Sequence, residues 1–180
     1  MTVALADDHV VVREGLRLLL ESDPEFVVVG QAANGIEALQ LVKHRKPKVL
    51  ILDLVMPSLD GLETTRRLSR LNVDTRVIIL TMYADEMYIL DALGSCAAGY
   101  VLKESCAADL FQAIRDVVAG RFYLSPALSR TFNARYLQRF RTTLLKLPPR
   151  LSICERRLLR VLEGASRKRS KRRQKGARSL

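Results

Sequence analysis

Up to Gly120, short apolar segments alternate with segments whose apolar residues repeat at helical spacing, and this alternation restricts the fold more than any other feature. Residues 49–52, Val-Leu-Ile-Leu, are apolar at every position, as in a strand that is buried on both faces. The segments expected to be strands are residues 3–6, 26–30, 49–52, 76–80 and 99–102. Strands that alternate with helices form a parallel sheet with helices on both faces, so we expect an α/β fold, a doubly wound five-stranded (βα)5 unit.

Charge is distributed unevenly between this unit and the rest of the 180-residue chain. Residues 1–122 hold 13 Lys and Arg against 17 Asp and Glu, a net charge of −4, while residues 123–180 hold 17 against 2, a net charge of +15. A segment this basic attracts polyanions such as nucleic acid or an anionic membrane surface. The N-terminal sequence lacks the pattern of a signal peptide, and no apolar run approaches the ~18 residues of a membrane span. We therefore expect a cytoplasmic protein with no membrane partner.

Beyond the first unit, which we place at residues 1–122, the sequence predicts three further segments. Residues 123–150 form a basic linker helix whose apolar residues are spaced four apart, which favours packing on the first unit or on a second copy over a membrane surface. Residues 151–164 form a short helix, in which Ser152 and Glu155 have the spacing of a capping box. Residues 165–180 are basic with almost no apolar side chains, which predicts a disordered tail.

Polar side chains follow the predicted strands at the end where a doubly wound sheet places its binding site. They are Asp7 and Asp8 after the first strand, Asp53 after the third, Thr81 after the fourth and Lys103 after the fifth. Because the carboxyl ends of parallel strands meet at one edge of the sheet, we expect these side chains to lie together in one site.

Three carboxylates in one site repel one another, and a hard divalent cation relieves that repulsion. Mg²⁺ prefers oxygen ligands and keeps several waters, which leaves room for a phosphoryl group. Asp53 can then attack phosphorus and form an acyl phosphate, since phosphoryl transfer depends mainly on positioning and charge neutralisation. Lys103 can contact one phosphoryl oxygen as a compact charge, and the Thr81 hydroxyl can donate to another.

A conformational switch follows from the same residues. If Thr81 moves toward the phosphoryl group, it vacates space beside the fifth strand into which Tyr100 can turn. A local change of charge at the site then alters the surface formed by the fourth helix and the fifth strand.

Each of these residues alone has a simpler structural explanation. A pair of aspartates after a strand more often caps a helix, and an isolated threonine or lysine usually lies at the surface. Their joint placement, with a Met-Pro and an Asp-Gly turn after Asp53, favours a site. His9 and His44 have no second His or Cys at metal-ligand spacing, so we assign them no role.

The order of these motifs resembles the response-regulator receiver family over about residues 1–122. The similar stretches are Leu5-Ala6-Asp7-Asp8-His9, Asp53-Leu54-Val55-Met56-Pro57-Ser58-Leu59-Asp60-Gly61-Leu62-Glu63 and Gly99-Tyr100-Val101-Leu102-Lys103. They further resemble the NarL/FixJ subfamily, which carries a C-terminal LuxR-type helix-turn-helix. The resemblance implies a CheY-like fold related to flavodoxin, and a receiver that pairs as a homodimer when phosphorylated.

The resemblance also implies roles for the site residues. Asp53 would take phosphate from a sensor histidine kinase, Asp8 and Asp53 would bind Mg²⁺ with the backbone carbonyl of Val55, and Asp7 would assist through water. Cys96 departs from the subfamily, which usually has glycine there, and we expect it to perturb the turn after the fourth helix.

The resemblance thus implies a response regulator that controls transcription through its LuxR-type DNA-binding region, and two other functions compete with it. An aspartate-based phosphohydrolase carries a second acid two residues after its nucleophile, where this chain has Val55, so we expect a phosphoacceptor with at most slow self-dephosphorylation and not an enzyme. Residues 151–164 resemble the opening helix of the LuxR-type domain, whereas residues 165–180 lack the length and apolar spacing of the remaining helices. A receiver-only interaction module or phosphate sink therefore stays open as an alternative.

The basic tail can still contact DNA phosphates without sequence preference. The candidate residues are Arg167, Lys168, Arg169, Lys171, Arg172 and Arg173.

Overall fold

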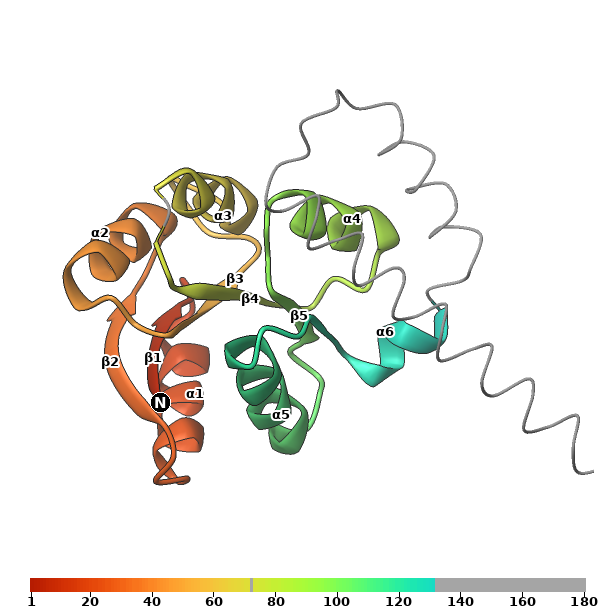
Figure 1. Ribbon diagram of the computed structural model, residues 1–180, viewed down its shortest axis with the longest axis horizontal. Helices are drawn as coiled ribbons and strands as arrows, with labels where there is room; N and C mark the ends of the chain where they lie inside the picture. The colour runs from red at the N-terminus through yellow and green to blue at the C-terminus, as the bar shows by residue number, and fades with distance from the viewer. Residues whose placement is uncertain (72, 132–180) are drawn as a thin grey trace, which may run out of the picture. The chain divides into compact units, whose positions relative to one another are not determined.

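The computed structural model describes residues 1–71 and 73–131, which form a parallel sheet with helices on both faces (Figure 1). The strands are β1 (Thr2–Ala6), β2 (Val27–Ala32), β3 (Val49–Asp53), β4 (Arg76–Thr81), β5 (Gly99–Leu102) and β6 (Tyr123–Leu124). Their order in the sheet is β2-β1-β3-β4-β5-β6, and every neighbouring pair is parallel. The predicted doubly wound sheet is confirmed, with its first five strands close to the expected residues.

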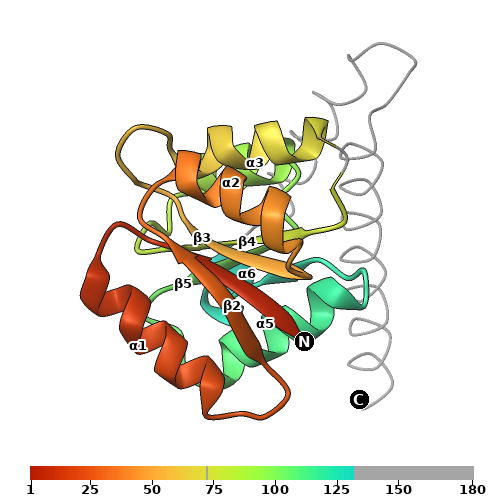
Figure 2. The same cartoon turned by 90° about the vertical axis from the view of Figure 1, so that its left-hand side faces the viewer.

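Helices connect the strands and cover the sheet from both sides. They are α1 (Val10–Glu21), α2 (Gly35–Arg45), α3 (Gly61–Arg70), α4 (Glu86–Gly94), α5 (Ala107–Val118) and α6 (Pro126–Thr131). Helices α1 and α5 lie on one face, and α2, α3 and α4 lie on the other (Figures 1 and 2). The chain runs outward from β1 to β2 and then returns to β3 on the other side of β1, so the strand order reverses between β1 and β3.

The central strands form the core because their side chains are apolar on both faces. All five residues of β3 are buried, as the continuous apolar run predicts. On the side of α1 and α5, a hydrophobic cluster joins residues of β1, β3, β4 and β5 to α5 and β6. This packing fixes the carboxyl ends of β1, β3, β4 and β5 beside one another.

The residues after α5 differ from the linker helix predicted over 123–150. Tyr123 and Leu124 form β6, which pairs with β5, and the helix begins only at Pro126. Tyr123 is buried in the hydrophobic cluster, and its hydroxyl donates to Asp109 at 3.2 Å. An apolar pair beside an open sheet edge gains more by pairing there than by joining a helix, and proline is well suited to the first helical turn.

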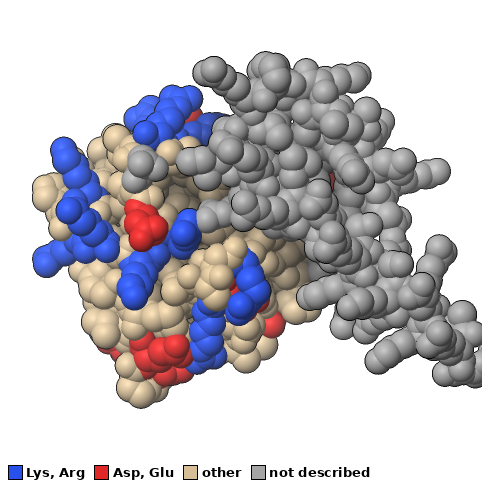
Figure 3. Space-filling model, viewed as in Figure 1, with Lys and Arg blue, Asp and Glu red and all other residues tan. Residues whose placement is uncertain are grey.

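The remaining predicted segments lie outside the described residues. They are the rest of the linker helix, the helix over 151–164 and the tail over 165–180. Within 1–71 and 73–131, no helix is long and apolar enough to cross a membrane. On the face drawn in Figure 3, the basic and acidic side chains of the described part are interspersed with uncharged surface.

The turn after α4 contains the predicted irregularity. Cys96 has φ +76°, in the left-handed region that favours glycine. The Ala97 amide donates to the Ala92 carbonyl at 2.9 Å, and the Cys96 amide donates to the Leu93 carbonyl at 3.1 Å. These two bonds form a Schellman motif, in which glycine usually takes the place of Cys96. The side chain therefore strains a turn whose hydrogen bonds are intact.

Candidate functional site

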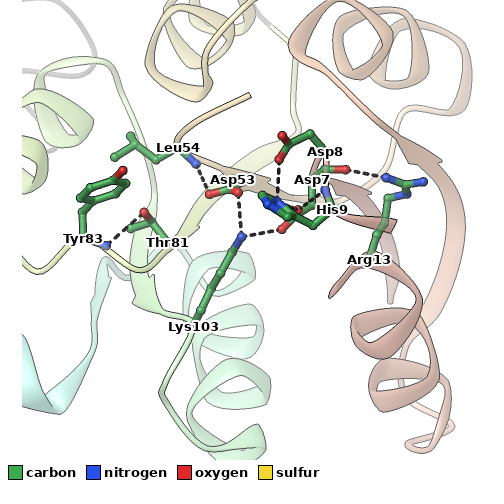
Figure 4. Close-up of polar contacts among 9 residues, drawn as sticks. All are labelled: Asp7, Asp8, His9, Arg13, Asp53, Leu54, Thr81, Tyr83 and Lys103. Atoms are coloured by element: carbon green, nitrogen blue, oxygen red, sulfur yellow. Dashed lines mark hydrogen bonds and ion pairs between the residues drawn. The ribbon is translucent and has the colours of Figure 1, made fainter. Parts of the chain in front are cut away.

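The predicted site residues meet at the carboxyl ends of four strands (Figure 4). Asp7 and Asp8 follow β1, Asp53 ends β3, Thr81 ends β4 and Lys103 follows β5. This edge lies beside the point where the strand order reverses, where doubly wound sheets bind their ligands.

Lys103 holds two of the carboxylates together. Its Nζ lies 2.7 Å from Asp53 Oδ2, to which it donates a hydrogen bond, and 2.7 Å from Asp7 Oδ2 as an ion pair. Asp7 and Asp53 are only 2% and 6% exposed. Two buried carboxylates this close would repel each other without a cation between them, so Lys103 supplies the charge that lets both remain in the site.

Burial changes the acid strength of these groups. Burial raises the pKa of Asp53 above its usual value, and the charge of Asp7 adds to the rise, while Lys103 opposes it. Burial lowers the pKa of Lys103, but its contacts with Asp53 and Asp7 outweigh that effect and raise it overall. Lys103 is therefore charged at neutral pH, and Asp53 is held in an environment that disfavours its negative charge.

The loop after Asp53 fixes the direction of its carboxylate. The Leu54 amide donates to Asp53 Oδ1 at 2.7 Å, and the Gly61 amide donates to the Leu54 carbonyl at 2.9 Å. A Cβ on Gly61 would lie 2.2 Å from the Asp53 carbonyl oxygen, so only glycine lets α3 begin this close to Asp53. Asp60 caps the same helix by accepting from the Glu63 amide at 2.7 Å.

An acidic cluster capable of holding a metal ion lies beside this carboxylate. Ligand atoms of Asp7, Asp8, His9 and Asp53 all fall within 4.8 Å of one another. Asp7 Oδ2 and Asp8 Oδ1 are buried, and their nearest polar partners are Lys103 Nζ and His9 Nδ1, at 2.7 Å and 2.8 Å. Closely spaced carboxylate oxygens suit a hard divalent cation, so this composition is typical of a receiver Mg²⁺ site. Val55 lies two residues beyond Asp53 with its side chain half exposed.

His9, to which the sequence assigned no role, and Arg13, which the sequence did not single out, both contact the aspartates after β1. The His9 amide donates to Asp7 Oδ1 at 2.8 Å, and His9 Nδ1 lies 2.8 Å from Asp8 Oδ1. Arg13 donates from Nη1 to the Asp7 carbonyl at 2.6 Å and from Nε to Gln31 at 3.0 Å. The only signal in the sequence was their position at the start of the helix that follows the Asp pair.

Thr81 and Tyr100 are connected through the main chain of Tyr83. Thr81 is fully buried, and its hydroxyl accepts a hydrogen bond from the Tyr83 amide at 3.3 Å. Tyr100 is also fully buried, and its hydroxyl donates to the Tyr83 carbonyl at 2.8 Å. Burial raises the pKa of Tyr100, so its hydroxyl remains a donor at neutral pH. The Tyr100 side chain is therefore already turned inward, before any movement of Thr81, and the main chain of Tyr83 links the two hydroxyls.

The residues predicted to contact DNA lie outside the described residues. They are Arg167, Lys168, Arg169, Lys171, Arg172 and Arg173.

Comparison with known proteins identifies the family. Residues 3–115 match the model of the response regulator receiver domain. The chain belongs to this family. The chain is 40% identical over 143 residues to the oxygen regulatory protein NreC of Staphylococcus epidermidis, an alignment that covers 79% of this chain and 66% of NreC. The chain thus spans slightly less than two thirds of the length of that relative.

Solved structures agree with this assignment. A two-component response regulator of the LuxR family from Aurantimonas sp. SI85-9A1 has a TM-score of 0.69 and 38% identity, covering 72% of this chain and 92% of that chain. CheY from Borrelia burgdorferi, in a complex with CheX, BeF3 and Mg²⁺, has a TM-score of 0.61 and 25% identity, covering 65% of this chain and 88% of that chain. The receiver fold and its kinship with LuxR-type regulators, as the motifs predicted, are confirmed.

Proposed function

We propose that this protein is a response regulator that accepts a phosphoryl group on Asp53 from a sensor histidine kinase and controls transcription. The observation that supports it best is the placement of Lys103 Nζ, 2.7 Å from both Asp53 and Asp7, beside a cluster of buried carboxylate oxygens. A buried carboxylate that faces a fixed cation and a metal-binding cluster is prepared for phosphoryl transfer, which requires positioning and charge neutralisation.

The acidic cluster would bind Mg²⁺ through Asp8, Asp53 and the carbonyl of Val55, with Asp7 assisting through water. When bound, the ion neutralises charge on the transferred group. The donor set fits because the site offers carboxylate oxygens within 4.8 Å of one another, and the Borrelia burgdorferi CheY complex contains both Mg²⁺ and BeF3.

Asp53 acts as the nucleophile in the proposed reaction. One carboxylate oxygen attacks the phosphorus of a phosphohistidine, an O–P bond forms as the P–N bond breaks, and the histidine nitrogen leaves with the electron pair. Lys103 would move its hydrogen bond from the carboxylate to a phosphoryl oxygen. The Thr81 hydroxyl, which now accepts from the Tyr83 amide, would turn to donate its proton to another phosphoryl oxygen. With Val55 two residues after the nucleophile, no second acid assists water, so self-dephosphorylation is slow.

Transcription is the proposed output. The Aurantimonas neighbour is a LuxR-family regulator, and residues 151–164 resemble the opening helix of a LuxR-type domain. Phosphorylation of Asp53 would promote pairing of two receivers and thereby change how the basic segment 123–180 meets DNA. The alternative, a receiver-only module or phosphate sink, is favoured by the basic composition of residues 165–180, which lacks the apolar spacing of a recognition helix.

Phosphorylation can be tested with a small-molecule donor. The purified protein, incubated with phosphoramidate and Mg²⁺, should gain the mass of one phosphoryl group, and Asp53→Asn should gain none. Asp91→Asn is a matched control, because Asp91 is an exposed aspartate on α4 and should leave labelling unchanged. Equal labelling of native protein and Asp53→Asn would refute the proposed phosphoacceptor.

The output can be tested by fluorescence anisotropy with promoter and scrambled duplexes across a salt series. A phosphate-dependent preference for one sequence would support the transcription regulator. Equal, salt-sensitive binding to both duplexes would support the alternative, because counterion release depends on phosphate contacts and not on base sequence.

A further inference from the structure

Ser125 is the first residue after β6, and its side chain is bound to the strand that leads to Lys103. Ser125 is fully buried. Its Oγ accepts a hydrogen bond from the Leu102 amide at 3.1 Å, and its own amide donates to the Tyr100 carbonyl at 3.0 Å. The hydroxyl also lies 3.1 Å from the hydroxyl of Ser105. Ser125 therefore contacts the end of β5 through both its main chain and its side chain.

The hydroxyl of Ser125 replaces a main-chain acceptor. Strand β6 pairs with β5 only through Tyr123 and Leu124, and a longer strand would offer its next carbonyl to the Leu102 amide. The Ser125 carbonyl instead accepts from the Leu128 amide at 3.0 Å, because the chain turns there into α6. Since Leu102 is buried, its amide needs a partner, and the side chain of Ser125 provides it.

This hydrogen bond directly precedes Lys103 in the chain. On the opposite side of β5, the Lys103 amide donates to the Thr81 carbonyl at 2.8 Å. Two successive amides thus fix the end of β5 between β4 and Ser125. From this anchored point the Lys103 side chain extends to Asp53 and Asp7 (Figure 4).

The side-chain bond to the Leu102 amide gives Ser125 a role at the end of β5. We propose that Ser125 is a positioning residue for Lys103: by holding the Leu102 amide, it places the lysine so that its ammonium group meets the phosphoryl group on Asp53. This inference rests on the proposed phosphoacceptor function. Ser125 contacts none of the acidic residues, so its loss should slow phosphorylation without weakening the binding of Mg²⁺.

The test compares rates of phosphorylation by phosphoramidate in the full-length protein. Ser125→Ala should be slower by about 3–10-fold, the effect of losing one buried hydrogen bond next to a positioned group. Ser125→Thr retains the hydroxyl and should stay within about twofold of the native rate. Valine has the shape of threonine but no hydroxyl, so Ser125→Val should be as slow as Ser125→Ala. Ser105→Ala is a control, because it removes the neighbouring hydroxyl but not the acceptor of the Leu102 amide.

Two further measurements separate positioning from general damage. Mg²⁺ affinity, measured by calorimetry, should not fall in any Ser125 variant, because Ser125 contacts none of the acidic residues. In a Lys103→Met background, Ser125→Ala should cause no additional slowing, because a residue that acts through Lys103 has no effect once that lysine is absent. The thermal unfolding of each variant, followed by circular dichroism, establishes that it is folded; if Ser125→Ala is not, the Thr and Val pair gives the comparison.

The outcomes distinguish this inference from the proposed function. Normal phosphorylation of the native protein with an unchanged rate in Ser125→Ala and Ser125→Val would overturn the inference alone. Equal losses of rate and Mg²⁺ affinity, or additional slowing in the Lys103→Met background, would also overturn it. If the native protein accepted no phosphoryl group, the proposed function would fail and the inference with it.

Discussion

At the scale of single residues, the site depends on one cation between buried carboxylates. Lys103 contacts Asp53 and Asp7 at 2.7 Å each, and both carboxylates are almost completely buried. The carboxylates alone would destabilise the fold, because each loses its hydration on burial. Stability and function are therefore coupled at this residue, since the same ammonium group that allows the carboxylates to be buried would bind the phosphoryl group.

Replacement of Lys103 by methionine tests this coupling. We expect Lys103→Met to lose about 3 kcal/mol of unfolding free energy without divalent cations, because it leaves two close buried carboxylates uncompensated. Mg²⁺ should recover a larger part of the stability in the variant than it adds to the native protein. Urea unfolding with and without Mg²⁺ measures both effects.

Lys48→Met is the matched control for that comparison. Lys48 is exposed and its side chain forms no ion pair with the described residues, so its loss should change stability by less than about 0.5 kcal/mol. Equal stability of Lys103→Met and the native protein in the absence of Mg²⁺ would contradict the coupling.

At the scale of secondary-structure elements, the start of α3 is set by how closely it approaches β3. A Cβ on Gly61 would lie 2.2 Å from the Asp53 carbonyl and 3.1 Å from the Leu54 Cα, both main-chain atoms that cannot move aside. In α1, by contrast, a Cβ on Gly15 would meet nothing within 4 Å. Replacing Gly61 and replacing Gly15 should therefore have opposite effects on stability.

Alanine substitutions at these glycines should change stability in opposite directions. Gly61→Ala should lower the unfolding free energy by about 1–3 kcal/mol, because α3 must shift away from Asp53, and it should also slow phosphorylation. Gly15→Ala should raise the free energy by about 0.5–1 kcal/mol through helix propensity alone. Chemical denaturation of both variants measures the difference, and a Gly61→Ala protein as stable as Gly15→Ala would disprove the close approach.

At the scale of the whole molecule, folding and net charge are concentrated in different parts of the chain. The described hydrophobic core extends from Val3 to Leu128, whereas the net charge of +15 belongs to residues 123–180. A core that is complete within one segment predicts that this segment folds by itself. The basic segment then accounts for any attraction to polyanions, since residues 1–122 carry a net charge of −4.

A fragment of residues 1–131 tests this division. It should unfold cooperatively and accept phosphate from phosphoramidate in the presence of Mg²⁺, because the core and the acidic cluster are both retained. It should lose the salt-sensitive binding to duplex DNA that we expect of the full chain. Circular dichroism and fluorescence anisotropy measure the two properties, and DNA binding by the fragment equal to that of the full chain would rule out the basic segment as its source.

The sequence by itself determined the doubly wound sheet, because the periodicity of strands and helices is a local feature. It also determined that Asp7, Asp53 and Lys103 meet, because each lies at the carboxyl end of a strand and these ends share one edge of a parallel sheet. It also placed a strained turn at Cys96. Only the tertiary structure decided the features that depend on the approach of distant segments. Strand β6, at two residues, is too short to show periodicity and forms because β5 offers an open edge.

The sequence also could not predict which individual polar groups contact one another. The bond between Ser125 and Leu102 joins residues 23 positions apart, and the contact between Lys103 and Asp53 joins residues 50 apart. A sequence pattern gives the type and order of such groups, but which donor reaches which acceptor depends on the twist and packing of the sheet. The sequence therefore determined the chemistry available to this protein, and the tertiary structure decided how its groups are paired.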